Sequence, residues 1–521
     1  MGWRRQYIIL LAIRLYFALQ PSYIHPDEHF QGPEVIAGEI FNWPTLQTWE
    51  FTSEKPIRSF FPLWFIYGIP MQVLDWIMPG TAPPRPIVTF YVLRILAFLA
   101  SFMLEDWALQ DLASSPRSRK RNLLFLASSY VTWTYQTHTL SNATETITLL
   151  GALVLIERIT KSRANAFMPS FLFGLIAVFG IFNRITFPCY LLLPAMKLVP
   201  HFIRRPWSLV TILLSASITT IYAIYLDTLF YNPSADFKGV FLLRDTAPVI
   251  TPLNNILYNT RTSNLAQHGL HPRYTHFLVN LPQLLGPAFV SILLSPSKRL
   301  LTSTPFLSAV SGVTILSFMP HQEARFLIPA IPLLLTVTPL PRTGLSKNLW
   351  LSAWVGFNAI FGVFMGMYHQ AGIVPAQNWL ATNTNATQIV FWKTYPPPSW
   401  LLGERNLQTN LTDLMGTPVN ELMAALDDVA DCGEEQEVAE GDGTLGKGEA
   451  YLVVPVSAVK LDPLVDNPSL SWRLEEMHTF KKHLNMDDLD IPEEGVIGTW
   501  RRVVGRRGLR IWRVKKRRCD V

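Results

Sequence analysis

The sequence predicts a polytopic α-helical membrane protein of about eleven transmembrane helices, followed by a small α/β C-terminal region. Of its 521 residues, 49% are hydrophobic and only 16% are charged, and the mean hydropathy is +0.22. This is too much apolar side chain for an ordinary soluble fold. Apolar runs close to the roughly 20 residues that a bilayer requires recur along the chain as far as Tyr368 and then stop.

Each of these apolar runs predicts one span. They lie near residues 7–19, 87–104, 123–137, 146–159, 167–182, 186–198, 208–226, 277–294, 302–318, 326–340 and 349–368. The first run is interrupted by Arg14, and the "ALQPS" that follows it is a poor cleavage site. We therefore expect a retained membrane anchor at the N-terminus and not a cleaved signal peptide.

Basic residues predict the orientation, because Lys and Arg near span ends remain on the cytosolic side. Clusters such as "PRSRKR" and "RITKSR" occupy every second connection. The intervening connections hold "HPDEHFQ", "LSNATET", "HQEARF" and "HQAG", which places them on the lumenal face together with the C-terminal region. The net charge of +6 is thus explained by topology, and no nucleic-acid partner is expected.

The chain is expected to divide into a membrane core, 1–372, with a first lumenal loop at 21–86, and a soluble lumenal region, 373–521. In the latter, "AYLVVPVSAV", "VIGTWRRVV" and "GLRIWRV" read as strands, and "GRRG" predicts a hairpin between the last two. The acidic run 427–449 reads as a solvated loop. The three cysteines lie far apart, which suggests neither a zinc site nor a disulfide framework.

Asparagine sequons fit a lumenal location of the C-terminal region. Asn385 and Asn410 each head an Asn-x-Thr sequence and are predicted to be glycosylated. Asn142 heads a third such sequence, but it lies too close to a span end for modification to be expected.

The first candidate site is "SYIHPDEHFQGPE", which follows the first apolar run and holds His25, Asp27, Glu28, His29 and Gln31. A charge beside a bilayer costs several kcal/mol unless it is paired or hydrated. A single acid there would be explained by a loop facing water. Adjacent acids between two histidines instead indicate a functional site.

Two further clusters each allow two interpretations. The stretch "TWEFTSEKPIRSFFPLW" interleaves aromatic residues with Lys55 and Arg58, as expected of an interfacial belt or of a sugar-binding rim beside a lipid headgroup. The stretch "MPHQEARFLIP" brings His321, Glu323 and Arg325 to the mouth of two apolar runs. There, Arg325 could form an ion pair with Glu323 or bind a phosphate group through its planar guanidinium.

These motifs, with "NRITFP", "HGLHPRYTHFLVNLP" and "MYHQAGI", run in order from about residue 20 to 372. Together they resemble the endoplasmic reticulum mannosyltransferases that use dolichyl-phosphate mannose. Within this family, three features are most similar to the enzymes that add the fourth mannose to the glycosylphosphatidylinositol (GPI) precursor. They are His25 before Pro-Asp-Glu, "PIRS", and "FWKTYPPP". The GPI third-mannose enzymes and the related N-glycan precursor enzymes remain alternatives.

The resemblance implies a GT-C type fold with two amphipathic helices in the first lumenal loop. It also implies an inverting transfer from dolichyl-phosphate mannose to the 2-hydroxyl of the third mannose of a GPI precursor, which gives an α-1,2 linkage. The expected partners are these two lipid substrates and the membrane lipids around them. No cofactor is expected, and no metal, because Arg and His can neutralise a single leaving phosphate.

The resemblance also assigns roles to individual residues. Asp27 is the expected base, with Glu28 as the alternative or as an orienting partner. The leaving phosphate is expected to bind Arg325, with His321, Arg184 and Arg58 as further candidates. The expected substrate-binding residues are His25, His29, Gln31, Asn142, Glu145, His271, Tyr274, Glu323 and His369. Core or interface positions explain the lone histidines equally well, and a polar contact between helices would equally explain Asn142 and Glu145.

Two classes of protein other than enzymes have to be weighed. A transporter or lipid scramblase would place ionisable groups near mid-span and show repeated halves, whereas here these groups gather at span ends. A noncatalytic assembly subunit would tolerate alanine at Asp27.

Overall fold

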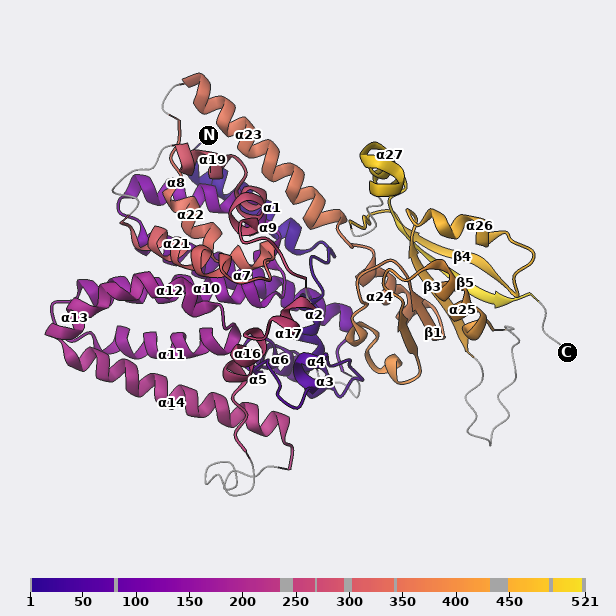
Figure 1. Cartoon of the computed structure of the whole chain (residues 1–521), viewed down its shortest axis with the longest axis horizontal. Helices are drawn as coiled ribbons and strands as arrows, with labels where there is room; N and C mark the ends of the chain where they lie inside the picture. The colour runs from indigo at the N-terminus through magenta and orange to yellow at the C-terminus, as the bar shows by residue number, and fades with distance from the viewer. Residues whose placement is uncertain are drawn as a thin grey trace. The chain divides into compact units, whose positions relative to one another are not determined.

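The structure is a computed structural model of the whole chain (Figure 1). It describes residues 2–78, 83–234, 247–267, 269–294, 302–341, 344–431, 448–486 and 491–517. The chain forms two compact units, and each is built from segments that are distant in sequence. The first unit comprises Met1–Ala18, Gln47–Pro70 and Leu93–Gly362. The second comprises Leu19–Leu46, Met71–Val92 and Val363–Val521, so part of the first loop belongs with the C-terminal region.

The first unit is a bundle of helices. Its longer helices are α1 (Trp3–Ala18), most of α7 (Pro86–Leu112), α8 (Pro116–Ala127), α10 (Ser141–Lys161), α11 (Phe167–Asn183), α12 (Phe187–Ala195), α14 (Pro206–Tyr231), α16 (Thr251–Asn259), α19 (Pro287–Leu294), α21 (Thr304–Ser317), α22 (Ala330–Val337) and α23 (Gly344–Val363). Short helices connect them: α4 (Trp49–Thr52), α5 (Phe60–Leu63), η1 (Trp64–Gly68), α9 (Tyr130–Trp133), η2 (Tyr135–Thr137), η3 (Met196–Leu198), α13 (Val199–Arg204), α17 (Thr262–Ala266), η4 (His276–Asn280), α18 (Leu281–Leu285) and η5 (Ala324–Leu327).

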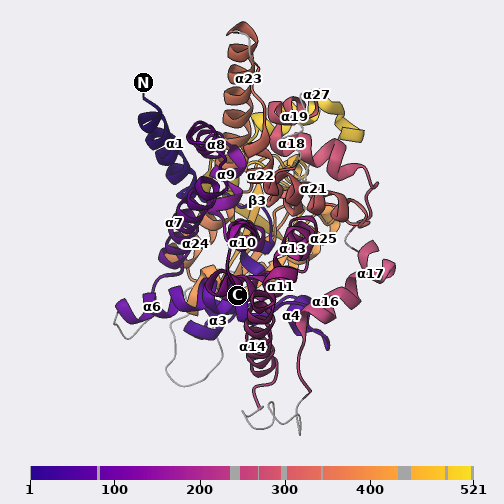
Figure 2. The ribbon, with the colours of Figure 1, turned by 90° about the vertical axis from the view of Figure 1, so that its left-hand side faces the viewer.

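Several of these helices pack in a row. In Figures 1 and 2, α14, α11 and α10 lie side by side in this order. On its other side α10 contacts α12, which packs on α21, and α21 packs on α22. Gly174 allows α11 to approach α14 closely, because a Cβ at this position would lie 2.0 Å from Ser215 Oγ and 2.7 Å from Ile212 O. Such small residues are typical of contacts between helices in membranes.

Four helical stretches in the described part of the chain are long and apolar enough to cross a membrane. They are Phe60–Ile77, Pro86–Leu112, Pro206–Tyr231 and Gly344–Tyr368. Two sharply bent helix pairs, Tyr130–Thr137 with Ser141–Lys161 and His276–Leu285 with Pro287–Leu294, raise the number to six if each pair is one span. Several other apolar runs form helices that are too short to count, so the expected eleven spans are not confirmed.

The second unit contains a five-stranded mixed sheet. Its strands are β1 (Ala386–Phe391), β2 (Asn410–Asp413), β3 (Glu449–Pro455), β4 (Trp472–Phe480) and β5 (Leu509–Lys516), arranged in the order β2-β1-β3-β5-β4. β1 pairs in parallel with β2 and β3, whereas β5 pairs antiparallel with β3 and β4. This sheet confirms that the C-terminal region is a small α/β unit.

Helices cover both faces of this sheet. Successive side chains of a strand point to opposite faces, so neighbouring residues of β3 show which helix packs on each face. Along β3, Leu452 packs in a cluster with Leu422 and Leu426 of α25 (Val419–Val429). Its neighbour Tyr451 packs on the opposite face, in a cluster with Ile373 of α24 (Ile373–Asn383). The remaining helices of this unit are α2 (Asp27–Phe30), α3 (Pro33–Phe41), most of α6 (Ile69–Ile77), η6 (Phe364–Tyr368), η7 (Ser399–Leu407), η8 (Val459–Leu461), α26 (Asp462–Val465) and α27 (Ile491–Gly505).

The predicted hairpin around "GRRG" is wrong. The segment "VIGTWRRVV" lies in α27, and β5 pairs with β3 and β4 instead. The burial of the side chains shows the reason. Thr499 and Val503 are buried, whereas Ile497 and Trp500 are exposed. A strand would bury Ile497 together with Thr499, two residues away, whereas a helix buries residues four apart. Of the predicted acidic loop, the described beginning includes the end of α25, and residues 432–447 lie outside the described residues.

Candidate active site

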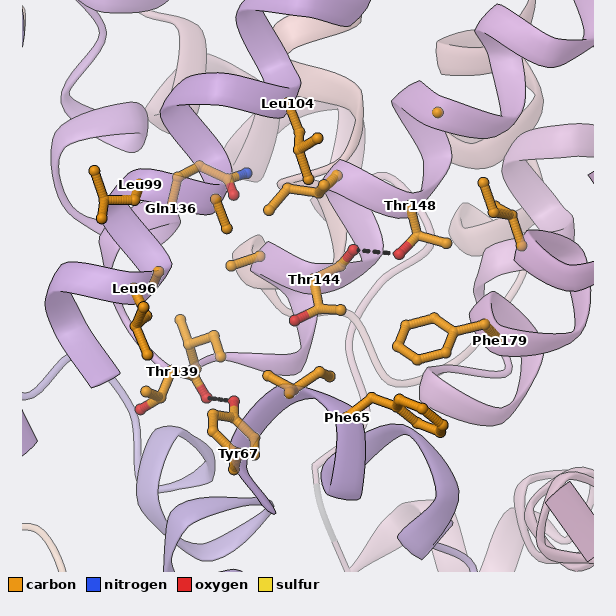
Figure 3. A pocket seen from close by; sticks show the side chains of 18 of the residues that line it. Phe65, Tyr67, Leu96, Leu99, Leu104, Gln136, Thr139, Thr144, Thr148 and Phe179 are labelled. Atoms are coloured by element: carbon orange, nitrogen blue, oxygen red, sulfur yellow. Dashed lines mark hydrogen bonds between the residues drawn. The ribbon is translucent and has the colours of Figure 1, made fainter. Parts of the chain in front are cut away.

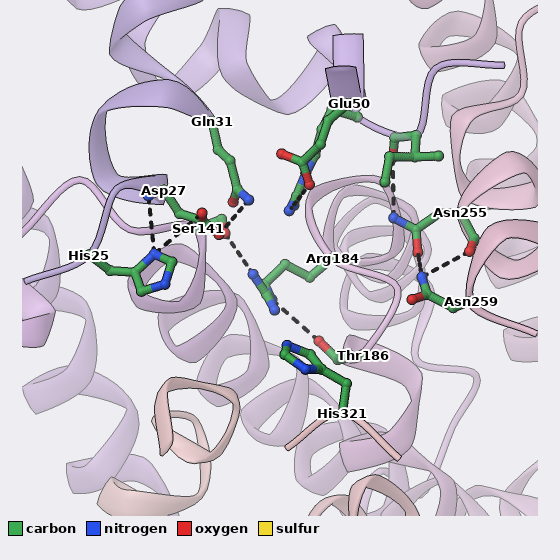
Figure 4. Close-up of polar contacts among 12 residues, drawn as sticks. His25, Asp27, Gln31, Glu50, Ser141, Arg184, Thr186, Asn255, Asn259 and His321 are labelled. Atoms are coloured by element: carbon green, nitrogen blue, oxygen red, sulfur yellow. Dashed lines mark hydrogen bonds and ion pairs between the residues drawn. The ribbon is translucent and has the colours of Figure 1, made fainter. Parts of the chain in front are cut away.

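The first polar cluster lies in the second unit, at the start of α2. Asp27 opens this short helix, and its backbone N–H donates to His25 Nδ1 at 3.1 Å. The same imidazole nitrogen lies 3.3 Å from Asp27 Oδ1. One helical turn later, the Gln31 amide donates to Oδ2 of Asp27 (Figure 4). The Gln31 amide therefore orients the carboxylate, and the His25 ring lies beside it.

The adjacent acids Asp27 and Glu28 have different surroundings. The Asp27 side chain is 18% exposed, whereas that of Glu28 is only 1% exposed. Glu28 Oε1 lies 3.7 Å from Nε2 of His29, and the Nδ1 of that ring accepts a hydrogen bond from the Trp400 indole at 3.3 Å. Of the two acids, Asp27 is thus the one that is partly exposed to solvent.

A third acid in this loop, Glu34, is entirely buried. It accepts hydrogen bonds from the Ser399 hydroxyl, from the Leu46 N–H at 3.0 Å and from the Trp400 N–H at 3.2 Å. Burial raises the pKa of Glu34 to about 7, although these hydrogen bonds act in the opposite direction. Glu34 therefore ties the first loop to the start of η7. Glu34 belongs to the acidic stretch singled out in the sequence, but no local pattern predicted its contact with η7.

The second polar cluster lies in the first unit, where α11 ends and α10 begins. Arg184 Nε lies 3.1 Å from Oε2 of Glu145, a buried ion pair. The Arg184 Nη1 donates to the Ser141 hydroxyl at 2.8 Å (Figure 4), and the Thr186 hydroxyl donates to Glu145 Oε1 at 2.6 Å. The motifs "LSNATET" and "NRITFP" thus form one site, although more than 30 residues separate them.

Asn142 lies beside this cluster and is fully buried. Neither atom of its side-chain amide has a hydrogen-bond partner among the described residues. A buried amide without partners is unfavourable by about 1–3 kcal/mol. Among the described residues the Asn142 amide therefore makes no polar contact between helices, which was one of the two interpretations left open by the sequence.

A group of cationic side chains surrounds the ring of Phe326. The guanidinium of Arg184 lies 5.4 Å from the ring centroid and that of Arg325 lies 5.3 Å from it. The ring of His321 is 5.6 Å away. Two arginines and a histidine around one aromatic ring form a cluster suited to a phosphate group.

The ion pair between Glu323 and Arg325, one of the two interpretations of this motif, is present. Glu323 also binds His321, whose Nε2 lies 2.8 Å from Oε1 of the carboxylate. This hydrogen bond raises the pKa of His321 above its usual range, because it favours the charged imidazolium. Glu323 thus holds both cations in place, and the two interpretations of this motif are compatible.

Arg58 lies near Arg184, and both side chains line a small polar pocket with Asn183 and Asn255. Both Arg58 Nε and Nη2 donate to Glu50 Oε1, at 3.0 and 2.8 Å. The "PIRS" motif therefore places Arg58, ion-paired with Glu50, beside Arg184.

Polar side chains of α14 and α16 hold the "PIRS" motif in position. Tyr231 donates to the carbonyl of Arg58 at 2.6 Å, and Asn255 donates to that of Ile57 at 3.2 Å (Figure 4). Asp227 accepts from Ser59 and from the two residues that follow it. The sequence analysis missed these residues, although an acid at the end of an apolar run, as in "DTLFY", was a signal that could have found Asp227.

The other expected site residues lie in varied surroundings. The rings of His271 and His321 have centroids 5.7 Å apart, so His271 lies beside this group. Tyr274 is 58% exposed. His369 is buried in the second unit, where its carbonyl accepts from Tyr23 N–H at 3.1 Å, and burial lowers the pKa of His369 to about 4. Its imidazole is therefore neutral near pH 7.

The molecule therefore has an accessible carboxylate in one unit and a cluster of cations in the other. A carboxylate can accept a proton from an alcohol, and arginine with histidine can stabilise a departing phosphate. Among the described residues, no group of three or more His, Cys, Asp or Glu side chains is arranged to hold a metal ion.

Comparison with known proteins identifies the family. The sequence pattern of the Alg9-like mannosyltransferase family matches residues 6–402, which include both polar clusters. The chain belongs to this mannosyltransferase family.

Two relatives resemble this mannosyltransferase over nearly its whole length. A protein of Emericella nidulans named GPI mannosyltransferase 4 is 47% identical over 99% of both chains. A protein of the same name from Aspergillus oryzae is 45% identical over 99% of this chain and 100% of its own.

A solved structure supports the fold of the mannosyltransferase. The crystal structure of ArnT from Cupriavidus metallidurans bound to undecaprenyl phosphate matches with a TM-score of 0.52, over 91% of this chain and 96% of that one. The sequence identity is 11%, so the likeness concerns the fold alone. It confirms the expected GT-C type architecture without fixing the number of spans.

Proposed function

We propose that the protein is an endoplasmic reticulum α-1,2-mannosyltransferase that adds the fourth mannose to the GPI precursor, with dolichyl-phosphate mannose as donor. The observation that carries the proposal is the similarity, over nearly the full length, to two proteins named GPI mannosyltransferase 4. The chain would be a multi-pass protein with its N-terminus in the cytosol and its site in the lumen, as the distribution of basic residues favours.

In the proposed reaction, the 2-hydroxyl of the third mannose attacks C1 of the donor mannose. Asp27 accepts the hydroxyl proton as the new C1–O bond forms. The bond from C1 to the phosphate oxygen breaks, and dolichyl phosphate leaves with the electron pair. Attack opposite the leaving group inverts the configuration at C1, so a β-linked donor gives an α-linked product.

The leaving phosphate gains negative charge as its bond to C1 breaks. The geometry around Phe326 supports the assignment of its stabilisation to Arg184, Arg325 and His321, with Arg58 at the edge of the same group. Asn142 is assigned to an acceptor hydroxyl, because its buried amide lacks a partner among the described residues. No metal ion is required by this assignment.

The test uses the full chain reconstituted in proteoliposomes with dolichyl-phosphate mannose and a synthetic GPI precursor bearing three mannoses. The expected product is one hexose heavier and is trimmed by an α-1,2-specific mannosidase. A precursor with two mannoses is tested in parallel, because its elongation in place of the three-mannose precursor would identify a third-mannose enzyme and refute the proposal.

The base is tested with Asp27→Asn, which keeps the shape of the side chain but cannot accept the proton. We expect kcat to fall by about 10² to 10⁴, the usual contribution of a general base. Asp466→Asn, at an exposed position of the second unit, is the matched control and should retain the rate. Equal rates for Asp27→Asn and the unsubstituted protein would refute the assignment of the base.

A further inference from the structure

The helical unit contains a large, partly open apolar cavity of about 680 Å³. It lies among η1, α7, α10 and α11, and its lining includes Phe65, Leu96, Leu104, Thr144 and Phe179 (Figure 3). This volume falls within the range of about 300–1,000 Å³ that is typical of small-molecule sites. Nothing in the proposed transfer of mannose uses it.

The cavity is long enough for a lipid chain. Along α7 its lining runs from Leu93 to Trp107, which is about 21 Å at a rise of 1.5 Å per residue. The hydrocarbon core of a bilayer is about 30 Å thick, so the chains of one leaflet span about 15 Å. A complete acyl chain of a membrane lipid therefore fits along the helix.

Polar groups mark both ends of the cavity. Tyr67 and Thr139 both line one end, and the Tyr67 hydroxyl donates to the Thr139 carbonyl at 2.8 Å (Figure 3). Further along α10, Arg158 marks the other end and pairs with Asp111 at 3.1 Å. An amphiphile would lie here with its headgroup at the Tyr67 end and the remainder, including the start of its chain, between the helices.

Gln136 of η2 supplies the observation that points to a particular ligand. It lines the cavity, is only 2% exposed, and its amide points inward in Figure 3. Neither its Oε1 nor its Nε2 has a hydrogen-bond partner among the described residues. Buried polar groups nearly always have a partner, so an amide left without one in an apolar cavity indicates a ligand that carries a polar atom.

This polar atom distinguishes between two kinds of lipid. The polyprenyl chain of a dolichyl donor has no oxygen along its hydrocarbon, and so it offers Gln136 nothing to bind. An acyl chain begins at an ester, whose carbonyl oxygen accepts a hydrogen bond from an amide. We propose that the cavity binds an acyl chain of the glycolipid acceptor, with Gln136 Nε2 donating to the ester carbonyl. This inference depends on the proposed function.

The first experiment removes the hydrogen bond without changing the shape of the cavity. Gln136→Met is compared with the unsubstituted full chain on two synthetic three-mannose acceptors, which differ only in an ester or an ether link to the same alkyl chain. We expect the KM for the ester acceptor to rise about tenfold, as for one lost hydrogen bond. The KM values for the ether acceptor and for the donor should not change.

The second experiment fills the cavity. A Cβ on Gly151, which lines it, would meet Ile176 Cδ1 at 3.7 Å, an ordinary contact. Gly151→Leu thus places a larger side chain there and should raise the KM for the long-chain acceptor about tenfold, the effect of about two displaced methylene groups. In the control Gly356→Leu on α23, no described residue outside the helix lies within 4 Å of the added Cβ, and KM should not change.

Three outcomes would overturn the proposal. The first is an equal change of KM for ester and ether acceptors in Gln136→Met, because the ester carbonyl would then have no part. The second is a rise in the donor KM alone, which would assign the cavity to the polyprenyl chain. The third is an acceptor KM that neither variant changes. By contrast, failure of the unsubstituted protein to elongate any three-mannose acceptor would refute the proposed function itself.

Discussion

The clamp formed by Asp227 gives the sharpest test of how the "PIRS" motif is positioned. This carboxylate is fully buried near the end of α14. Its Oδ1 accepts from the Ser59 hydroxyl at 2.9 Å and from the N–H groups of Phe60 and Phe61 at 2.9 and 3.1 Å. Its Oδ2 accepts from the Thr251 hydroxyl at 2.7 Å. We expect Asp227→Ala to destabilise the helical unit and Asp227→Asn to do so much less.

The structure sets the size of the two effects. In Asp227→Ala, two backbone N–H groups at the start of α5 lose their acceptor in a buried site, and each costs about 1–3 kcal/mol. The two hydroxyls can rotate toward other acceptors, so the expected loss of unfolding free energy is about 4 kcal/mol. In Asp227→Asn, Oδ1 keeps its three donors, while the amide that replaces Oδ2 donates to the Thr251 hydroxyl instead of accepting from it. The charge is lost, which halves the strength of the bonds to Oδ1 and costs about 1–2 kcal/mol.

The assay is thermal unfolding of the full chain in nanodiscs, followed by the KM for the donor. Arg58 directly precedes this clamp, so a loosened segment should also raise the donor KM. Asp466→Ala, at an exposed position, is the control and should change the unfolding free energy by less than about 0.5 kcal/mol. Equal destabilisation by Asp227→Ala and Asp227→Asn would refute the reasoning, because it would show that the charge and not the hydrogen bonds matters.

Three further predictions concern titration and modification. His321 has a raised pKa and is charged below it, so kcat/KM should fall as pH rises through that pKa, and this limb should vanish from the pH–rate profile of His321→Gln. Burial raises the pKa of Glu34 from 4.5 to about 7, so the folded state binds this proton more tightly than the unfolded chain does. The free energy of unfolding should therefore fall by up to about 3 kcal/mol as the pH rises from 4.5 to 7. The pH dependence of the thermal midpoint should therefore flatten in Glu34→Gln, and an unchanged slope would contradict this. Asn385 and Asn410 are exposed, so replacing either with Gln should remove one glycan, whereas the buried Asn142 should carry none.

The sequence by itself determined the class of protein and its family. Apolar content and the loss of apolar runs after Tyr368 depend only on composition along the chain, and they correctly predicted a helical membrane part followed by an α/β region. The ordered motifs are equally local, and the family match confirms the resemblance that they indicated. The number of spans could not be read in this way. An apolar run does not reveal where a helix bends, as between Thr137 and Ser141, where two helices meet at 109°.

Only the tertiary structure decided which ionisable groups meet and which are accessible. Glu145 pairs with Arg184, and Asp227 holds Ser59 across 168 positions of sequence. Asp27 is partly exposed while its neighbour Glu28 is buried, although both have the same chemistry. Such differences arise because a local pattern gives the direction of a side chain along its own helix, whereas burial and long-range contacts depend on how separate helices pack against one another.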